Sequence, residues 1–550
     1  MKKLISILIL ATLLLAACGQ ATAQPTADQP VQPTADQPVS EAKPLRLNVA
    51  HAWQPMKTDP SVAGDFAGET MLVNIYDTLV FPTPDGGLKP WVAEKWDTSD
   101  DGLTYTFYLR KGIKFHNTGN ELTAADVKFS MDRNLAIGQG HGYLWATRVE
   151  KTEAPDDYTV RFTIKKPYAL FVHTLLRLYI MDSKETVTHI QSGGEYGENG
   201  DYGTKWLVLN DAGSGPYAIK EFVLEEFLLL EKNKNWWAAD EFVKNSPDEV
   251  RLIPIPAPAT IKSLMANREL DLSDQWESAD TLRSLDQIDG VDIVLHDQVA
   301  QMYLYMNTAK APTDDVHFRR ALAYLWDYEA GAKISWEGTK ASKGPVPMSL
   351  SGFAETTTYS LNLDKAKEEL AQSKYANEPG KYPVEFAYDS ETPDKEKLAL
   401  LLQSNAQKIG IKVDITTAPW VALSAKAAKP ETTANIWAIT MSADLPEAGA
   451  LLFTRYHSST VGGFFQGEWL RDPKFDSMVE DSLATMDKTE RFAKYKEVQK
   501  YIMDLSPTIF AYDENAKRAY QTYLDWPVLQ GTAYGWMGFN EFYAWMSVNK

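Results

Sequence analysis

The sequence is short of the residues on which several classes of protein depend. It contains one cysteine in 550 residues, so no disulfide can form within the chain. Its eight histidines are scattered without the spacing of a ligand set, so we expect no metal and no cofactor. There is no GxxxxGK[ST], no GxSxG and no HExxH, which excludes P-loop nucleotide hydrolysis, the serine-hydrolase elbow and the common zinc-protease motif.

Positive charge is also scarce, with 55 Lys and Arg against 74 Asp and Glu. A net charge of −19 repels phosphate backbones, so we expect no nucleic-acid partner. The length permits two or more cores, and 44% hydrophobic with 23% charged residues is typical of a globular protein. The 16 Trp and 26 Tyr indicate a large core, an aromatic-lined pocket, or both.

The first residues predict an export signal and a tether. Lys2 and Lys3 precede an apolar run, Leu4–Leu15, which is too short for a usual membrane span and predicts a signal peptide over residues 1–17. The sequence Leu-Ala-Ala-Cys that ends at Cys18 resembles a bacterial lipobox, which implies that a lipid on Cys18 holds the protein at the outer face of a membrane. Residues 18–44 contain PTADQPV twice and predict a flexible spacer.

One stretch, Asn74–Arg133, organises the rest of the chain. Thr104–Arg110 alternates, with Tyr105, Phe107 and Leu109 on one face, and predicts a half-buried strand. Thr123 begins a predicted helix, and Asp126 three residues later is its capping-box partner. The block is therefore a turn, a strand, a basic-aromatic loop and a capped helix.

The same block carries a family resemblance. The order W…E.W..S.DGLTYTF.LRKGIKFH…LTA.DVKFS..R resembles the family 5 extracytoplasmic solute-binding proteins, the dipeptide-, oligopeptide- and nickel-binding components of ABC importers. Gly213–Phe222, Gln301–Asn307, Asp315–Asp327 and Gly344–Pro347 resemble later elements of that family, although Tyr328 replaces its usual Arg.

The resemblance implies an α/β fold of the two-lobed periplasmic-binding-protein type (class II, cluster C) with a third domain and hinge crossovers. We expect domain I at 45–77, 208–298 and 511–550, domain II at 78–207, and domain III, the second lobe, at 299–510. Helix-then-strand patterns independently favour an α/β third domain: Pro393–Ile409 has a helical apolar stripe, Gly410 follows it, and Ile411–Ile415 alternates.

Asp444 is the main candidate for ligand binding. In peptide-binding relatives, the stretch that matches Asn435–Thr454 supplies a carboxylate that pairs with the peptide α-amino group, and Asp444 aligns with it. Closing a cleft removes water from a cationic amine, so a fixed anion must replace that hydration. The alternative is that Asp444 caps a helix starting near Pro446. Met441, which is also a candidate for ligand binding, and Leu445 depart from the peptide-binding pattern and leave another substrate open.

Four aromatic residues are further candidates. Trp420 and Trp437 could stack on peptide side chains or sugars, and the family places Tyr143 and Trp145 near the ligand cleft. Each of the four could equally pack in a core. His457 lies near Asp444 and must be considered because nickel-binding relatives exist, but a core or surface histidine is the simpler interpretation.

We therefore expect a monomeric, lipid-anchored, extracytoplasmic protein that is not an enzyme. It would close its lobes around a ligand, with a peptide as the default and an oligosaccharide as the alternative, and deliver it to the permease subunits of an ABC importer. A secreted hydrolase, such as a glycosidase with a carboxylate pair, is the alternative of another class. A tethered adhesin is a third.

Overall fold

The computed structural model describes residues 43–51, 57–255, 257–356, 359–532 and 534–550. The chain divides into two units, Met1–Lys43 and Pro44–Lys550. The predicted signal peptide, Cys18 and almost all of the tether lie outside the described residues. The description that follows concerns the second unit, which contains two lobes that we call the first and second lobe.

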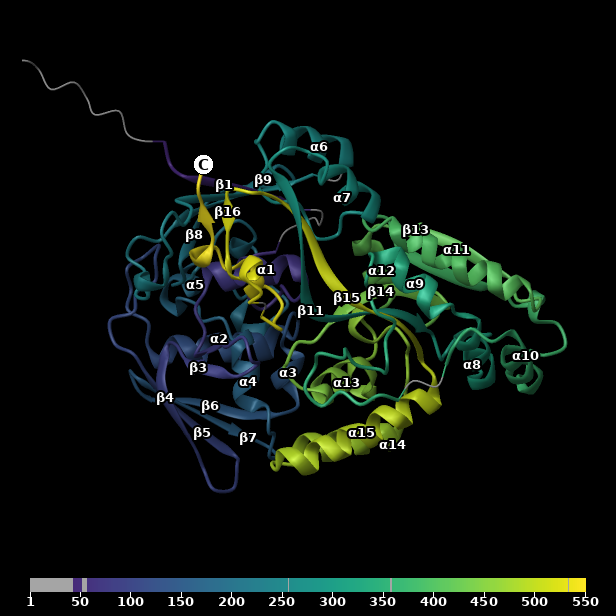
Figure 1. The fold of residues 1–550 in the computed structure, drawn as a ribbon. Helices are drawn as coiled ribbons and strands as arrows, with labels where there is room; N and C mark the ends of the chain where they lie inside the picture. The colour runs from purple at the N-terminus through teal and green to yellow at the C-terminus, as the bar shows by residue number, and fades with distance from the viewer. Residues whose placement is uncertain (1–42, 52–56, 256, 357–358, 533) are drawn as a thin grey trace, which may run out of the picture. The chain divides into compact units, whose positions relative to one another are not determined.

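The first lobe is built on a four-stranded sheet in the order β1-β10-β9-β8 (Figure 1). Its strands are β1 (Arg46–His51), β8 (Tyr217–Val223), β9 (Phe227–Lys232) and β10 (Glu249–Pro254). β1 pairs in parallel with β10, about two hundred residues further along the chain. Helix α1 (Phe66–Ile75) begins where it does because the Asp65 side chain accepts a hydrogen bond from the Gly68 N–H and caps the first turn.

The stretch Asn74–Arg133 contributes β4 and β5 to a second sheet in this lobe, which has the order β4-β5-β7-β6. Its strands are β4 (Ala93–Thr98), β5 (Thr104–Leu109), β6 (Val149–Asp156) and β7 (Thr159–Ile164). β5 buries Tyr105, Phe107 and Leu109 as predicted. Helix α2 (Ala124–Ile137) has the predicted capping box between Thr123 and Asp126.

The remaining elements of the first lobe are short. They are the strand pairs β2 (Val80–Pro82) with β3 (Leu88–Pro90) and β16 (Leu524–Asp525) with β17 (Ser547–Val548), and the helices α3 (Tyr143–Ala146), α4 (Phe171–Thr174), α5 (Ser183–Thr188), α6 (Pro258–Ala266) and α7 (Ala279–Leu285). The C-terminal segment returns to this lobe, because the amide of Asn74 in α1 donates to the Glu541 carbonyl at 2.9 Å.

The second lobe contains a five-stranded sheet in the order β13-β12-β14-β11-β15. Its strands are β11 (Val291–Met306), β12 (Val384–Asp389), β13 (Val413–Ala418), β14 (Ile436–Ser442) and β15 (Thr508–Gln521). β13 starts later than the alternation from Ile411 predicted, although Ile411 is buried. The helices are α8 (Val316–Leu325), α9 (Tyr328–Ser335), α10 (Leu363–Gln372), α11 (Asp394–Gln407), α12 (Trp420–Lys426), α13 (Ala448–Tyr456), α14 (Pro473–Ala484) and α15 (Lys488–Leu505).

Two long strands join the lobes (Figure 1). β11 and β15 run antiparallel from Val291↔Gln521 to Tyr305↔Thr508. The C-terminal part of β11, Ala300–Met306, also pairs with β14 and so belongs to the second-lobe sheet. At the other end, Leu272 of the first lobe bridges Tyr520. The ladder is irregular between Asp297 and Ala300, where Val299 has a φ of +50°. These strands are the hinge crossovers that the resemblance implied, and they place a cleft between the lobes.

Candidate functional site

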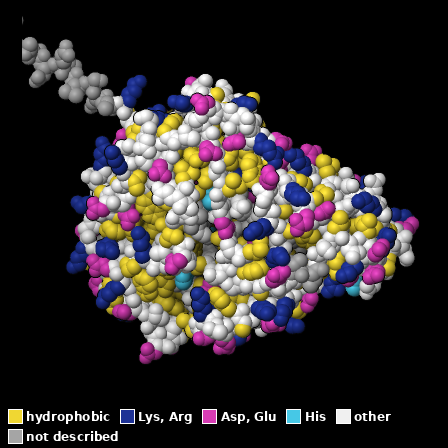
Figure 2. All heavy atoms as spheres, viewed as in Figure 1, with side chains coloured by type: hydrophobic (Ala, Val, Ile, Leu, Met, Phe, Trp, Pro, Cys, Tyr) yellow, Lys and Arg dark blue, Asp and Glu magenta, His cyan; other side chains and the backbone are white. Residues whose placement is uncertain are grey.

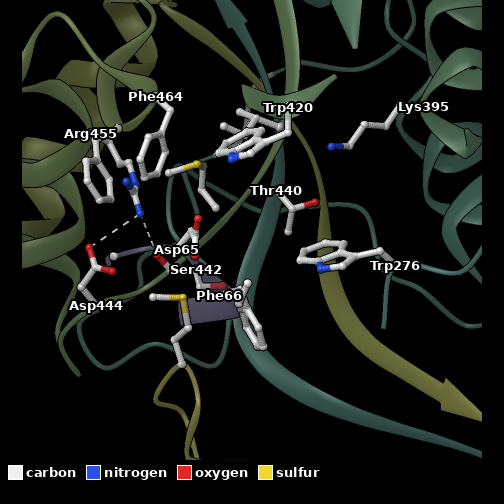
Figure 3. Close-up of a pocket in the computed structure, with 16 residues that line it drawn as sticks. Asp65, Phe66, Trp276, Lys395, Trp420, Thr440, Ser442, Asp444, Arg455 and Phe464 are labelled. Carbon is white, nitrogen blue, oxygen red and sulfur yellow. Dashed lines mark hydrogen bonds and ion pairs between the residues drawn. The ribbon is translucent and has the colours of Figure 1, made fainter. Parts of the chain in front are cut away.

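A cavity of about 80 Å³ lies between the lobes. The first lobe contributes residues 64–67, Trp276 and Met537, and the second lobe contributes Lys395, Trp420, residues 439–442, Asp444, Arg455, Phe464 and Phe465. Most of these side chains are apolar. Figure 3 shows Asp444 and Arg455 together at one end, with Trp276 and Lys395 at the other.

Asp444 lies where the chain has just left β14 at Ser442. Its side chain is 4% exposed and lines the cavity. The Tyr143 hydroxyl donates to its Oδ2 at 2.7 Å, and Arg455 Nη2 lies 3.8 Å from the same oxygen. No described residue hydrogen-bonds to Oδ1, so this carboxylate keeps capacity for a donor from a ligand.

The interpretation of Asp444 as a helix cap is wrong. Helix α13 begins at Ala448, and its N-cap residue is Glu447. Asp444 instead holds a contact across the cleft, because Tyr143 belongs to α3 of the first lobe. Burial and the Asp444 charge raise the pKa of the Tyr143 hydroxyl well above its usual value, so it stays a donor.

Arg455 brings unused donors to the same end of the cavity. It lies in the last turn of α13, is 1% exposed, and donates from Nη2 to the Ser442 carbonyl at 2.8 Å. Its Nε and Nη1 have no hydrogen-bond partner among the described residues. Burial lowers the pKa of Arg455, but the Asp444 charge and nearby tyrosines more than offset this and raise it, so the guanidinium is charged. Its free donors suit a carboxylate or carbonyl oxygen.

Aromatic rings form the wall between the two ends. The Trp420 ring lies 5.3 Å from Phe464 and 5.5 Å from Trp437, measured between centroids. Trp420 and Met441 line the cavity, whereas Trp437 is 2% exposed and lies behind Trp420. Trp437 therefore supports the ring that faces the cavity rather than forming its surface.

The two aromatic candidates of α3 have different environments. Tyr143 contacts the second lobe through Asp444 and through the Phe465 ring, whose centroid is 5.1 Å away. Trp145 is fully buried, and its indole N–H donates to Thr174 Oγ1 at 2.9 Å. Trp145 is thus packed in the core of the first lobe and is not among the residues that line the cavity.

His457 does not face the cavity. Its Nε2 lies 3.2 Å from Glu480 Oε1, and its ring stacks on Phe453. Within the described parts of the chain, no group of three or more His, Cys, Asp or Glu side chains is placed to hold a metal ion.

Several cavity residues were missed from the sequence. These are Phe66, Trp276, Lys395, Arg455, Phe464 and Phe465. The Gly462-Gly463-Phe464-Phe465 run was a usable signal, because paired glycines indicate a turn and binding residues are often found on loops. Arg455 and Trp276 gave no local signal, since they come to the cavity through the packing of α13 and the closure of the lobes.

The molecular surface gives no sign of a polyanion site on the face drawn in Figure 2. Lys and Arg are interspersed there with Asp and Glu, and no large patch of positive charge forms. In the part of the chain that is described, no helix is both long and apolar enough to span a bilayer.

Comparison with known proteins decides the family. Residues 87–463 match the bacterial extracellular solute-binding proteins, family 5 Middle. The chain belongs to this family. The chain is 27% identical over 483 residues to the probable D,D-dipeptide-binding periplasmic protein DdpA of Escherichia coli, covering 86% of this chain and 89% of the relative. It is 26% identical over 530 residues to heme-binding protein A of Haemophilus influenzae, covering 91% of each.

A solved structure confirms the two-lobed fold of this family 5 protein. The periplasmic binding protein DppA of Helicobacter pylori, in complex with the peptide STSA, superposes with a TM-score of 0.80 at 23% identity and covers 92% of this chain and 99% of that one. The names of these relatives point to different ligands, a dipeptide, heme and a tetrapeptide, so membership of the family does not by itself fix the ligand.

Proposed function

We propose that the protein captures a short peptide between its lobes and hands it to an ABC import permease. The observation that carries the proposal is the Asp444 carboxylate, buried at one end of the cavity with Oδ1 unused. A peptide α-ammonium group that loses its water on closure needs such an anion. Two of the three relatives described above are named for, or bound to, peptides.

Arg455 supports the same ligand class. A peptide offers carbonyl and carboxylate oxygens within a few bonds of its amino group, and the free Nε and Nη1 of Arg455 stand beside Asp444. The aromatic wall of Trp420 and Phe464 would cover an apolar side chain. A zwitterion with an apolar portion therefore matches the cavity better than a neutral sugar, although an oligosaccharide remains the alternative that the aromatic wall would accept.

The anchoring and delivery parts of the proposal come from the sequence. Cys18, after Leu-Ala-Ala, would carry the lipid, and the repeated PTADQPV segment would let the binding unit move above the membrane. The family is described as solute-binding, which supports the proposal that the protein is a carrier and not an enzyme.

The test is to identify what the purified protein holds. The protein is purified gently, denatured, and the released small molecules are identified by mass spectrometry. Short peptides that rebind with one-to-one stoichiometry, and that Asp444→Asn fails to rebind, would support the proposal. Released hexose oligomers would move it to the sugar alternative, and conversion of a bound oligomer to products would favour a hydrolase.

A further inference from the structure

A second, polar cavity of about 50 Å³ adjoins the first. The two cavities share Trp276, Lys395 and Thr440 in their walls. Figure 3 shows these three residues at the end of the first cavity that lies away from Asp444 and Arg455. A ligand whose one end is held at Asp444 would therefore extend toward the second cavity.

The walls of the polar cavity come from both lobes and from both crossovers. The loop 275–278 faces it from the first lobe, β11 and β15 contribute from the hinge, and the start of α11 contributes from the second lobe. The cavity is therefore enclosed only when the two lobes lie against each other. The Ala279 backbone N–H holds them together here by donating across the cleft to Asp394 Oδ2 at 2.8 Å.

The positive charges in this cavity are already compensated. Lys395 Nζ lies 2.5 Å from Asp389 Oδ1, and both side chains are buried. Lys517 Nζ lies 2.6 Å from Glu514 Oε1. Neither ammonium group is free to recognise an anion, so the polar cavity is not built for a carboxylate.

The acceptors, by contrast, are not satisfied. No described residue forms a hydrogen bond or an ion pair with the Glu277 carboxyl. Gln275 is 4% exposed, and neither its amide oxygen nor its amide nitrogen has a hydrogen-bond partner in the described part of the chain. The same is true of the Gln298 amide oxygen. All three side chains line the cavity. Buried polar groups without partners carry a free-energy penalty that a suitable donor would remove.

We propose that this cavity binds a second cationic group of the ligand, an ammonium or guanidinium, with Glu277 as its counter-charge and the Gln275 and Gln298 amide oxygens as acceptors. The inference rests on the proposed function. It narrows the proposed ligand from short peptides in general to short peptides that carry a basic side chain. Trp276 stands where the two cavities meet, so it would cover the aliphatic part of that side chain.

The charged groups around Glu277 make the recognition proton-linked. Asp274 is on the same loop, Asp394 and Lys395 face the cavity from α11, and the Glu514–Lys517 pair faces it from β15. Burial, and then the Asp274 charge, raise the pKa of Glu277 to about 8. The carboxyl is therefore mostly protonated at neutral pH in the empty cavity, and it must release that proton when it pairs with a cation.

The experiment compares matched peptides that differ by one charge. Ala-Lys and Lys-Ala are titrated against Ala-norleucine and norleucine-Ala by calorimetry at neutral pH, using the intact protein stripped of co-purified ligand. Each titration is run in two buffers of different ionisation enthalpy, which reports the protons released. We expect a lysine peptide to bind at least about tenfold more tightly than its norleucine counterpart, with release of close to one proton.

The variant Glu277→Gln keeps the size of the side chain and removes the charge, and Glu269→Gln, an exposed glutamate nearby in the sequence, is its control. Loss of both the lysine preference and the proton release in Glu277→Gln alone would support the inference. Equal binding of lysine and norleucine peptides, or a preference that survives Glu277→Gln, would overturn it while the proposed function stands. Failure of all four peptides to bind would overturn the proposed function and this inference together.

Discussion

The carboxylates of Asp444 and Glu447 are three residues apart in the chain and differ in how fully the protein satisfies them. Glu447 is 7% exposed, and it receives two hydrogen bonds of 2.8 Å from the Arg491 guanidinium and one of 2.9 Å from the Tyr495 hydroxyl. All these partners belong to the second lobe. The Glu447 carboxylate is therefore complete before any ligand arrives, and its role is to hold α13 against α15.

Asp444 also has an arginine and a tyrosine near it, but it is incomplete. Its tyrosine comes from the other lobe, and its arginine stands 3.8 Å away with two donor groups unused. Glu277, in the polar cavity, has no described partner. Glu447, Asp444 and Glu277 thus have progressively fewer protein partners. The comparison teaches that a buried carboxylate is a candidate binding group only when it lies beside a cavity and keeps unused hydrogen-bonding capacity.

The largest expected effect is on the complete carboxylate. Glu447→Ala leaves the Arg491 guanidinium buried without its counter-charge, so the free energy of unfolding should fall by about 3–5 kcal/mol. Urea denaturation measures it, with the exposed Glu497→Ala on α15 as the control. A loss below about 1 kcal/mol would mean that this ion pair behaves as an exposed one.

Asp444→Asn should weaken ligand binding strongly and change stability little. The binding of the identified peptide should weaken at least about 30-fold, because the ligand ammonium would be buried without an anion. The free energy of unfolding should change far less than in Glu447→Ala, since the variant amide can still accept from Tyr143. Unchanged affinity by calorimetry would remove Asp444 from the binding site.

The ionisation of Glu277 should make the free energy of unfolding depend on pH. Its pKa is about 8 in the folded protein against 4.5 as the ordinary value. The stabilisation from the protonated carboxyl is thus fully present below pH 4.5 and is lost as the pH rises through about 8. Between about pH 6 and pH 9 the unfolding free energy should fall by about 1–2 kcal/mol more in the wild type than in Glu277→Gln. Parallel curves would show that the carboxyl is ionised throughout.

The smallest effect is expected for the contact between lobes. Tyr143→Phe removes one hydrogen bond to Asp444 and keeps the ring against Phe465. Peptide affinity should fall about threefold to tenfold, because the closed arrangement loses one bond of ordinary strength. A loss as large as that of Asp444→Asn would indicate that the hydroxyl itself contacts the ligand.

Local patterns predicted the elements well and the site only in part. The alternation of Thr104–Arg110 and the cap at Thr123 depend on neighbouring residues, and the structure has both. Asp444 became a candidate through the resemblance of Asn435–Thr454 to the matching stretch of peptide-binding relatives. Trp420 and Trp145 could not be ranked, because an indole at a core position and one at a cavity look alike in sequence.

The rest of the site depends on tertiary packing. Arg455 reaches the cavity because α13 runs back past the end of β14, and Trp276 because the first lobe closes on the second. Nothing within several residues of either position encodes that approach. The same holds for the unsatisfied amide of Gln275, which is visible only when every neighbour is placed.

The adjacency of Tyr305 and Thr508 on β11 and β15 has a consequence for how the chain could be divided. The polypeptide enters and leaves the second lobe at one place, so that lobe is a single insertion whose ends are already side by side. A cut through the two strands at the irregularity between Asp297 and Ala300 would separate two modules, and the second lobe would keep its own sheet. New second lobes could be grafted at this junction without altering the connectivity of the first.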